Sequence, residues 1–141
     1  MKIEFWDKDE IENDQHDYAV IVTRYNDKWI FVRHHARNTW ELPGGRREQG
    51  ESVEDAARRE LNEETGASQY DLTPICSYSV TRGEEFSFGL LCYAVVQAFD
   101  DDLIFEIAEI RSFDDCPKLI TYPEIVPELL KRVALFLGVE K

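Results

Sequence analysis

The sequence predicts a mixed α and β domain, an α/β or α+β sandwich in which strands surround one central helix and a second helix closes the chain. Three observations predict it. Runs rich in β-branched and aromatic residues recur on both sides of one capped, helix-periodic segment at 52–65. A second helix-periodic segment lies near the end. The 141 residues, 43% of them hydrophobic, suit a single domain over 1–141 with its own core.

The first part of the chain has the pattern of β-structure. An initial strand is expected at about 3–6, anchored by apolar and aromatic residues. Two longer strands are expected at 18–25 and 28–33. Asn26 and Asp27 lie between them and are typical of a hairpin turn.

A short extended piece at 40–42 and a tight turn at 43–45 are expected to lead, through a loop, into the central helix at 52–65. Ser52 is a good N-cap for this helix, with an acidic residue three positions later as in a capping box. Gly66 suits its C-terminal cap.

Further strands are expected at 70–80, 86–99 and 103–113. Pro123 is well placed in the first turn of a second helix, and Gly138 suits its end. The apolar face of that helix is predicted to be formed by Val126, Leu129, Leu130, Val133 and Leu137.

The central helix carries an unusual arrangement of acids. Its apolar stripe at helical spacing is Val53, Ala56, Ala57 and Leu61. Glu60 falls inside that stripe, Glu64 projects from the same side, and Glu63 flanks them. Carboxylates at these spacings repel one another, and burial adds a desolvation cost. A hard divalent cation would resolve the conflict, since Mg²⁺ and Mn²⁺ prefer carboxylate oxygens. A solvated acidic helix face is the alternative.

The surrounding residues favour the metal site. Nine fixed positions over 23 residues are Gly45, Glu51, Arg59, Glu60, Leu61, Glu63, Glu64, Gly66 and Ala67. This pattern resembles the signature of the Nudix hydrolases, and the preceding segment 40–45 is similar to the approach to that signature. The resemblance implies the Nudix fold, an α/β/α sandwich with a mixed central sheet.

The resemblance also implies metal ligands. Glu60 and Glu64 match the main metal-binding carboxylates of the family, and Glu63 matches a third acid that shares the metal or activates water. Glu51 matches a position that helps to hold the metal shell. Gly45 matches a glycine whose backbone carbonyl can bind the metal. Mg²⁺ is the expected cofactor, with Mn²⁺ as the alternative.

Other roles are expected around this helix. Arg59 matches the residue that orients the carboxylates and, with Glu60, Glu63 and Glu64, completes the expected catalytic group. Arg37 and Arg46 are candidates for substrate binding. Glu106 and Glu109 are candidates for a further acid from a later segment. For Glu106 and Glu109, ordinary surface placement is at least as strong an alternative, and for most arginines of this region, Arg37 and Arg46 among them, a solvated position is the favoured alternative.

The implied reaction is metal-dependent hydrolysis of the pyrophosphate bond of a nucleoside diphosphate derivative. The favoured substrate is a nucleoside triphosphate, including an oxidised one, which would give the monophosphate and pyrophosphate. The alternatives are ADP-ribose, a nucleotide sugar or a dinucleoside polyphosphate. A catalytically silent nucleotide-binding regulatory module is a further alternative, although such domains typically lose one or more of these carboxylates.

Composition sets limits on partners and location. The net charge is −13, from 29 acidic and 16 basic residues, which disfavours binding to duplex nucleic acid. No run of 18 apolar residues suggests a membrane span, and the charged N-terminus is unlike a signal peptide. The three cysteines fit no disulfide framework. We therefore expect a cytoplasmic protein that binds a small nucleotide, as a monomer or a homodimer.

Overall fold

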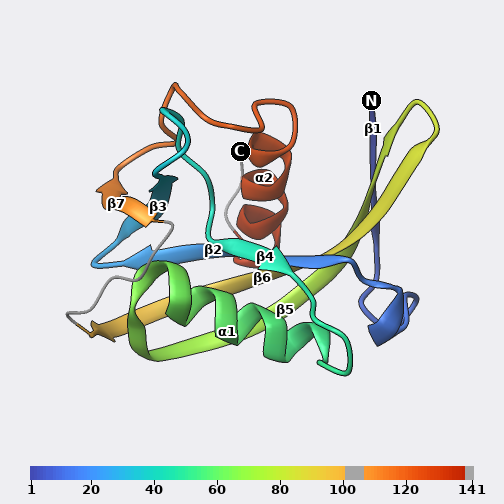
Figure 1. Ribbon diagram of the computed structural model, residues 1–141, viewed down its shortest axis with the longest axis horizontal. Coiled ribbons are helices and arrows are strands. Elements are labelled where there is room, and N and C mark those ends of the chain that lie inside the picture. The colour runs from blue at the N-terminus through green and yellow to red at the C-terminus, as the bar shows by residue number, and fades with distance from the viewer. Residues whose placement is uncertain (101–106, 139–141) are drawn as a thin grey trace.

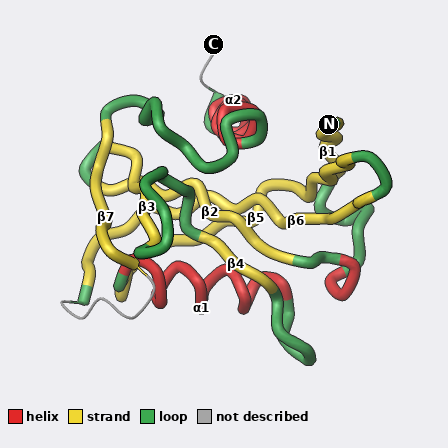
Figure 2. Tube along the Cα trace, turned by 45° about the horizontal axis from the view of Figure 1, so that its top comes forward, coloured by secondary structure: helices red, strands yellow, loops and turns green. Residues whose placement is uncertain are grey.

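The computed structural model of the protein describes residues 1–100 and 107–138 (Figure 1). A mixed β-sheet lies between two helices, α1 (Val53–Thr65) and α2 (Val126–Phe136). Figure 2 shows one helix on each face of the sheet. The predicted α/β/α sandwich is therefore confirmed.

In the described part of the chain the sheet has seven strands. They are β1 (Lys2–Trp6), β2 (Tyr18–Tyr25), β3 (Lys28–His34), β4 (Gly44–Arg46), β5 (Ala67–Arg82), β6 (Glu85–Phe99) and β7 (Ile107–Phe113). Their order is β1-β5-β6-β2-β3-β7, with β4 paired to β2. The β2–β6 pair is parallel and the other pairs are antiparallel, so the sheet is mixed. A short 3-10 helix, η1 (Asn13–Gln15), precedes β2.

The β2–β3 hairpin has the turn that its sequence predicts. Asn26 and Asp27 have φ angles of 49° and 63°. Two central residues with positive φ are the mark of the type I′ turn, whose twist matches that of the flanking strands. Residues of this kind tolerate the left-handed region because their short polar side chains bond locally.

The segment after Pro43 differs from its prediction. The sequence predicts a tight turn at 43–45, but only Pro43 lies in a bend, and the chain is extended at Gly44–Arg46, where β4 pairs with β2. A Cβ on Gly44 would lie 2.4 Å from the carbonyl oxygen of Ala19. Glycine is therefore needed here for close strand approach rather than for a reversal of the chain.

Helix α2 begins later than predicted. Pro123 lies in a turn before the helix, and Pro127 occupies the first turn instead. Val126, Leu129 and Val133 are buried as expected. The predicted contribution of Leu137 to this face is wrong: the helix ends at Phe136, and Leu137 is 40% exposed.

The two faces of the sheet have separate cores. The core beneath α1 includes Ala19, Ile21, Val53, Ala57, Leu61, Leu90 and Cys92. The core beneath α2 includes Val22, Phe31, Leu42, Tyr78, Leu91, Val126, Leu129 and Val133. Strands β2 and β6 contribute to both, because successive side chains of a strand point to opposite faces. This double burial holds the middle of the sheet rigidly between the helices.

The strand predicted at 103–113 is present from Ile107, and residues 103–106 lie outside the described part. Strand β5 extends the prediction at 70–80 in both directions, to Ala67 and Arg82. None of the helices found in the described residues has the length and apolar character needed to cross a bilayer.

Candidate active site

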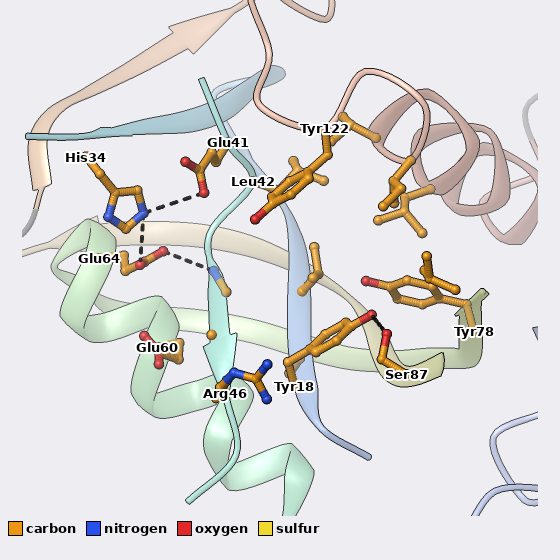
Figure 3. Close-up of a pocket in the computed structure, with 18 of the residues that line it drawn as sticks. Tyr18, His34, Glu41, Leu42, Arg46, Glu60, Glu64, Tyr78, Ser87 and Tyr122 are labelled. Carbon is orange, nitrogen blue, oxygen red and sulfur yellow. Dashed lines mark hydrogen bonds and ion pairs between the residues drawn. The ribbon is translucent and has the colours of Figure 1, made fainter. Parts of the chain in front are cut away.

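Helix α1 holds the acids of the predicted site in a fixed rotation against the sheet. The hydroxyl of its N-cap Ser52 accepts a hydrogen bond from the Asp55 amide at 3.0 Å, and Gly66 ends the helix at φ 77°. The predicted apolar stripe is buried: Val53, Ala56, Ala57 and Leu61. Its burial directs Glu60 and Glu64 toward β4 (Figure 3).

Glu64 is almost buried, with 8% of its surface exposed. Its Oε1 accepts a hydrogen bond from the Gly44 amide at 3.0 Å, and its Oε2 lies 3.4 Å from His34 Nε2. Figure 3 shows both contacts. A carboxylate withdrawn from water needs such partners, because an uncompensated buried charge is costly. Glu64 is thereby fixed where α1, β4 and the end of β3 meet.

Glu60 is packed against the backbone of β4. A Cβ built on Gly45 would fall 2.0 Å from Glu60 Oε2. Only the hydrogen of glycine leaves room for the carboxylate at this point. The structure therefore brings together Gly45 and Glu60, two of the residues predicted to share a metal ion.

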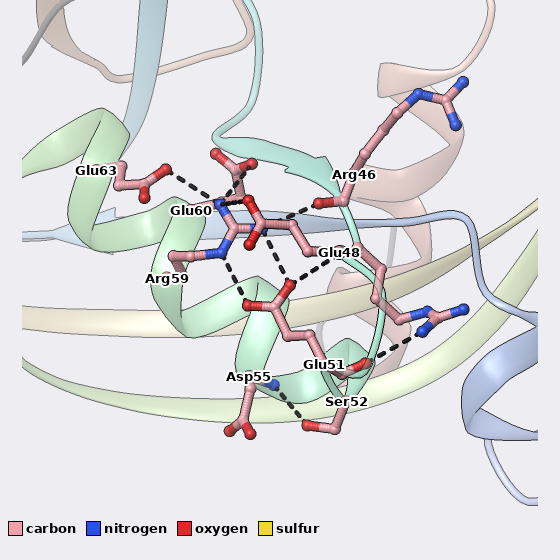
Figure 4. Close-up of polar contacts among 9 residues, drawn as sticks. Arg46, Glu48, Glu51, Ser52, Asp55, Arg59, Glu60 and Glu63 are labelled. Carbon is pink, nitrogen blue, oxygen red and sulfur yellow. Dashed lines mark hydrogen bonds and ion pairs between the residues drawn. The ribbon is translucent and has the colours of Figure 1, made fainter.

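Arg59 connects the acids on the outer side of the helix (Figure 4). Its Nε and Nη2 donate to the two oxygens of Glu51 at 2.8 and 3.1 Å. Its Nη1 lies 3.1 Å from Glu63 Oε1 and 3.3 Å from Glu60 Oε2. Its Nη2 also donates to the carbonyl of Arg46 at 3.0 Å. The planar guanidinium suits this bidentate geometry.

The contacts between Arg59 and Glu51 shift the pKa values of both groups. The pKa of Glu51 is lowered to about 2, first by its hydrogen bonds from the Arg59 side chain and then by one from the Glu48 amide. The pKa of Arg59 is raised, chiefly by the same bonds to Glu51. Both groups are therefore firmly charged at neutral pH.

The loop between β4 and α1 is anchored by residues that sequence reasoning did not single out. Arg47 donates to the carbonyls of His16, Asp14 and Glu51 at 3.0, 3.1 and 3.2 Å. The Asn13 side chain accepts a hydrogen bond at 2.6 Å from the first amide of α1. The partners of Arg47 are backbone carbonyls, which side-chain types do not indicate in advance, and Asn13 lies forty residues before the helix start that it contacts.

A cleft of about 1430 Å³ opens beside the acids, and Glu60 and Glu64 line it. Arg46 lines it too, as does Arg37, which forms an ion pair with Glu41. The wall facing α2 includes Tyr18 and Tyr122. The cleft therefore combines carboxylates, guanidinium groups and aromatic surface, which are the groups needed to hold a nucleotide and a cation.

The remaining acid candidates are placed differently. Glu109 lies on β7, where it forms ion pairs with Arg33 at 3.5 Å and with Arg111. It is not among the residues that line the cleft. Glu106 lies outside the described residues. The role of a further acid stays a prediction for both.

The donor atoms near α1 fit a hard divalent cation in their chemistry. Glu60, Glu63 and Glu64 offer carboxylate oxygens, and the backbone of β4 lies against Glu60 at Gly45. Within the residues described, however, no three His, Cys, Asp or Glu side chains are grouped as metal ligands. Glu60 and Glu63 instead form ion pairs with Arg59. Binding a cation would therefore require these side chains to turn inward from Arg59.

Comparison with known proteins places this site in a family. A family model described as the NUDIX domain matches residues 13–131. A protein of Bacillus subtilis (strain 168) named "Putative 8-oxo-dGTP diphosphatase YtkD" is 31% identical over 88 residues, which are 62% of this chain and 55% of that protein. A second protein from the same organism, named "Putative 8-oxo-dGTP diphosphatase", is 47% identical over 47 residues, 33% of this chain and 32% of that protein. The matched region thus spans about half, or less, of these curated relatives.

The fold agrees with this assignment. The crystal structure of the Bacillus subtilis pyrophosphohydrolase BsRppH matches with a TM-score of 0.81 at 24% identity, covering 98% of this chain and 93% of that one. The family match spans most of the chain and includes both β4 and α1, where the acids and their arginine lie. The chain belongs to the NUDIX domain family.

Proposed function

We propose that the chain is a divalent-cation-dependent pyrophosphohydrolase. It hydrolyses the pyrophosphate bond of a nucleoside diphosphate derivative, with a nucleoside triphosphate, including an oxidised one, as the favoured substrate. Water adds across the P–O–P bond, and the products are the nucleoside monophosphate and pyrophosphate. The observation that carries the proposal is the set of Glu60, Glu63 and Glu64, presented by one helix beside a cleft and organised by Arg59.

The acids and arginines have separate roles in this proposal. Glu60, Glu63 and Glu64 would hold Mg²⁺ together with the carbonyl of Gly45, with Glu51 supporting the outer side through Arg59. A cation held there would supply positive charge to the phosphate oxygens and would lower the pKa of a water bound to it. Arg59 connects Glu51, Glu60 and Glu63, and its positive charge offsets their mutual repulsion.

Substrate must approach a protein whose net charge is −13. Arg46 lines the cleft, and within the described residues its guanidinium has no ion pair. A guanidinium without a carboxylate partner is available to a phosphate oxygen, which it binds in a fixed, forked geometry. Arg37 is already paired with Glu41, so Arg46 is the better candidate for contact with the polyphosphate.

A substrate panel tests the activity. The purified chain is incubated with Mg²⁺ or Mn²⁺ and with nucleoside triphosphates including 8-oxo-dGTP, ADP-ribose, a nucleotide sugar and a dinucleoside tetraphosphate. Products are separated by chromatography. Monophosphate plus pyrophosphate from a triphosphate supports the favoured substrate. Cleavage restricted to one of the other compounds replaces it, and binding without turnover of any compound supports the regulatory alternative.

The variant Glu64→Gln tests the role of the carboxylate, because it keeps the size of the side chain and removes its charge. We expect this variant to lose at least about a hundredfold in kcat at saturating Mg²⁺ while it remains folded by circular dichroism. A kcat near that of the wild type would remove Glu64 from the mechanism.

A further inference from the structure

A second buried carboxylate lies across the cleft from helix α1. Glu41 is 8% exposed and follows β3 in a segment that pairs with Val32 through two backbone hydrogen bonds of 2.8 Å. Its Oε2 accepts a hydrogen bond from the Thr121 hydroxyl at 3.0 Å and contacts Arg37. The proposed reaction assigns no role to Glu41, so its burial calls for another explanation.

His34 links this carboxylate to the catalytic helix. Its Nε2 lies 3.7 Å from Glu41 Oε1 and 3.4 Å from Glu64 Oε2 (Figure 3). His34 Nε2 therefore lies between the two buried carboxylates, within ion-pair distance of each. Because the Gly44 amide holds the other oxygen of Glu64, the direction of the Glu64 carboxylate depends on where His34 lies.

Thr121 ties the network to the segment before α2. Its amide donates to the Trp40 carbonyl at 2.9 Å, and the Trp40 amide donates to the Leu119 carbonyl at 2.8 Å. Its hydroxyl is also 2.6 Å from that of Thr39. Since the proton of Thr121 is given to Glu41, Thr39 is the donor in this pair. The neighbouring Tyr122 lines the cleft.

We propose that Thr121 and Glu41 are positioning residues that orient Glu64 through His34. The cleft wall next to α2 is then connected to Glu64 by the hydrogen bond from Thr121 to Glu41 and by the polar contacts of His34 with Glu41 and Glu64. A ligand that shifts the segment carrying Tyr122 also shifts the Thr121 hydroxyl. Through the contacts of Glu41 and His34, this shift changes the orientation of the Glu64 carboxylate. Both consequences rest on the proposed metal site that includes Glu64, but the consequence for cation binding does not require the proposed hydrolysis.

Four variants test the relay, which is the series of contacts from Thr121 through Glu41 and His34 to Glu64. Thr121→Val removes the hydroxyl and keeps the branched shape, and Thr121→Ser keeps the hydroxyl. Glu41→Gln weakens the link to His34, and the double variant combines Thr121→Val with it. Thr73→Val is the matched control, because Thr73 is exposed on β5 and does not line the cleft. Mn²⁺ affinity is measured by titration calorimetry, together with kcat, KM and Tm.

We expect Thr121→Val to weaken Mn²⁺ binding about tenfold and to lower kcat similarly, with KM within about twofold of the wild type, as for the loss of a group that orients a metal ligand. Thr121→Ser should restore both. In the Glu41→Gln background, Thr121→Val should change Mn²⁺ affinity and kcat by less than about a further twofold, because Glu41→Gln has already weakened the link to His34.

Two results would overturn the relay. One is a Thr121→Val variant that loses Tm but matches Thr73→Val in Mn²⁺ affinity and kcat. The other is full additivity in the double variant. If the wild type hydrolyses no nucleotide, the proposed function fails, and the Mn²⁺ affinities alone still decide the relay; a wild type that binds no Mn²⁺ overturns it.

Discussion

At the scale of single residues, the contact between Gly45 and Glu60 shows how backbone shape controls a carboxylate. Gly45 is not in the left-handed region, so alanine fits its backbone. The added Cβ would nevertheless overlap the Glu60 carboxylate, which must then turn away. Because the obstacle is the end of a flexible side chain, folding should tolerate the change better than catalysis does.

We therefore expect Gly45→Ala to lower kcat about a hundredfold, the cost typical of a displacement of about 1 Å at a reacting centre. Its Tm should stay close to that of the wild type. Steady-state kinetics and a thermal melt on the same preparation check this. Equal losses of Tm and kcat would show that Gly45 acts on folding instead.

The second residue-scale effect is the pH dependence of the Arg59–Glu51 pair. The pKa of Glu51 is lowered from 4.5 to about 2, chiefly by Arg59. A lowered carboxylate pKa contributes stability that is complete above the ordinary value and is lost as pH falls through the lowered one. Glu51→Gln should thus reduce the free energy of unfolding by about 1–2 kcal/mol at pH 7, allowing for solvent screening of a partly exposed pair.

Urea denaturation of both proteins from pH 7 down to pH 2 measures this difference. The gap between wild type and Glu51→Gln should be constant above pH 4.5 and shrink steadily toward pH 2. A gap that does not change with pH would mean that packing, rather than the charge of Glu51, supplies the stability.

At the scale of elements, the start of α1 is held from outside its own segment. Ser52 caps the helix from within, while the Asn13 side chain, from η1, accepts a hydrogen bond from the first amide of α1. Four amides at a helix start lack partners inside the helix, so each external acceptor adds stability. The N-terminal segment is in this way part of the framework that positions the acids.

Asn13→Ala should lower the free energy of unfolding by about 1 kcal/mol, or Tm by about 3 °C. Asn13→Asp keeps the acceptor and places negative charge at the positive end of the helix, so it should retain most of the stability. Thermal melts of the three proteins provide the comparison. An Asn13→Asp variant as unstable as Asn13→Ala would exclude the capping role.

The elements best predicted from sequence are those set by local chemistry. The caps Ser52 and Gly66 and the turn at Asn26 and Asp27 each depend on the preferences of one or two residues, and all are confirmed. Strand β4 was mistaken for a turn because Gly44 is required by a distant strand, which local sequence does not reveal.

The candidate active site also combines residues that the sequence predicts with residues that it does not. Glu60 and Glu64 lie four residues apart on α1, so their common direction was predictable from helical spacing, whereas Glu63 lies on the outer side with Arg59. The partners Glu41 and Thr121 come from segments 80 residues apart, and only the pairing of those segments at Trp40 brings them together. The anchoring role of Arg47 could not be predicted either, because its partners are backbone carbonyls that no residue type indicates.

At the scale of the whole molecule, the net charge of −13 and the clustered acids both oppose folding through repulsion. A cation that binds only the folded chain offsets part of this cost by RT ln(1 + [L]/Kd), or about 2.7 kcal/mol at a hundred times Kd. Monovalent salt also screens the repulsion, so the comparison must be made at equal ionic strength.

We therefore expect Mg²⁺ to raise Tm by several degrees over an EDTA-treated sample at the same ionic strength. The rise should disappear in Glu64→Gln, because that variant lacks one proposed ligand. It should persist in Glu54→Gln, since Glu54 is exposed on α1 and pairs with Arg58 at 3.4 Å, away from the cleft. A rise of equal size in all three proteins would assign the stabilisation to general binding of cations by an acidic surface, and the metal site on α1 would lose its thermodynamic support.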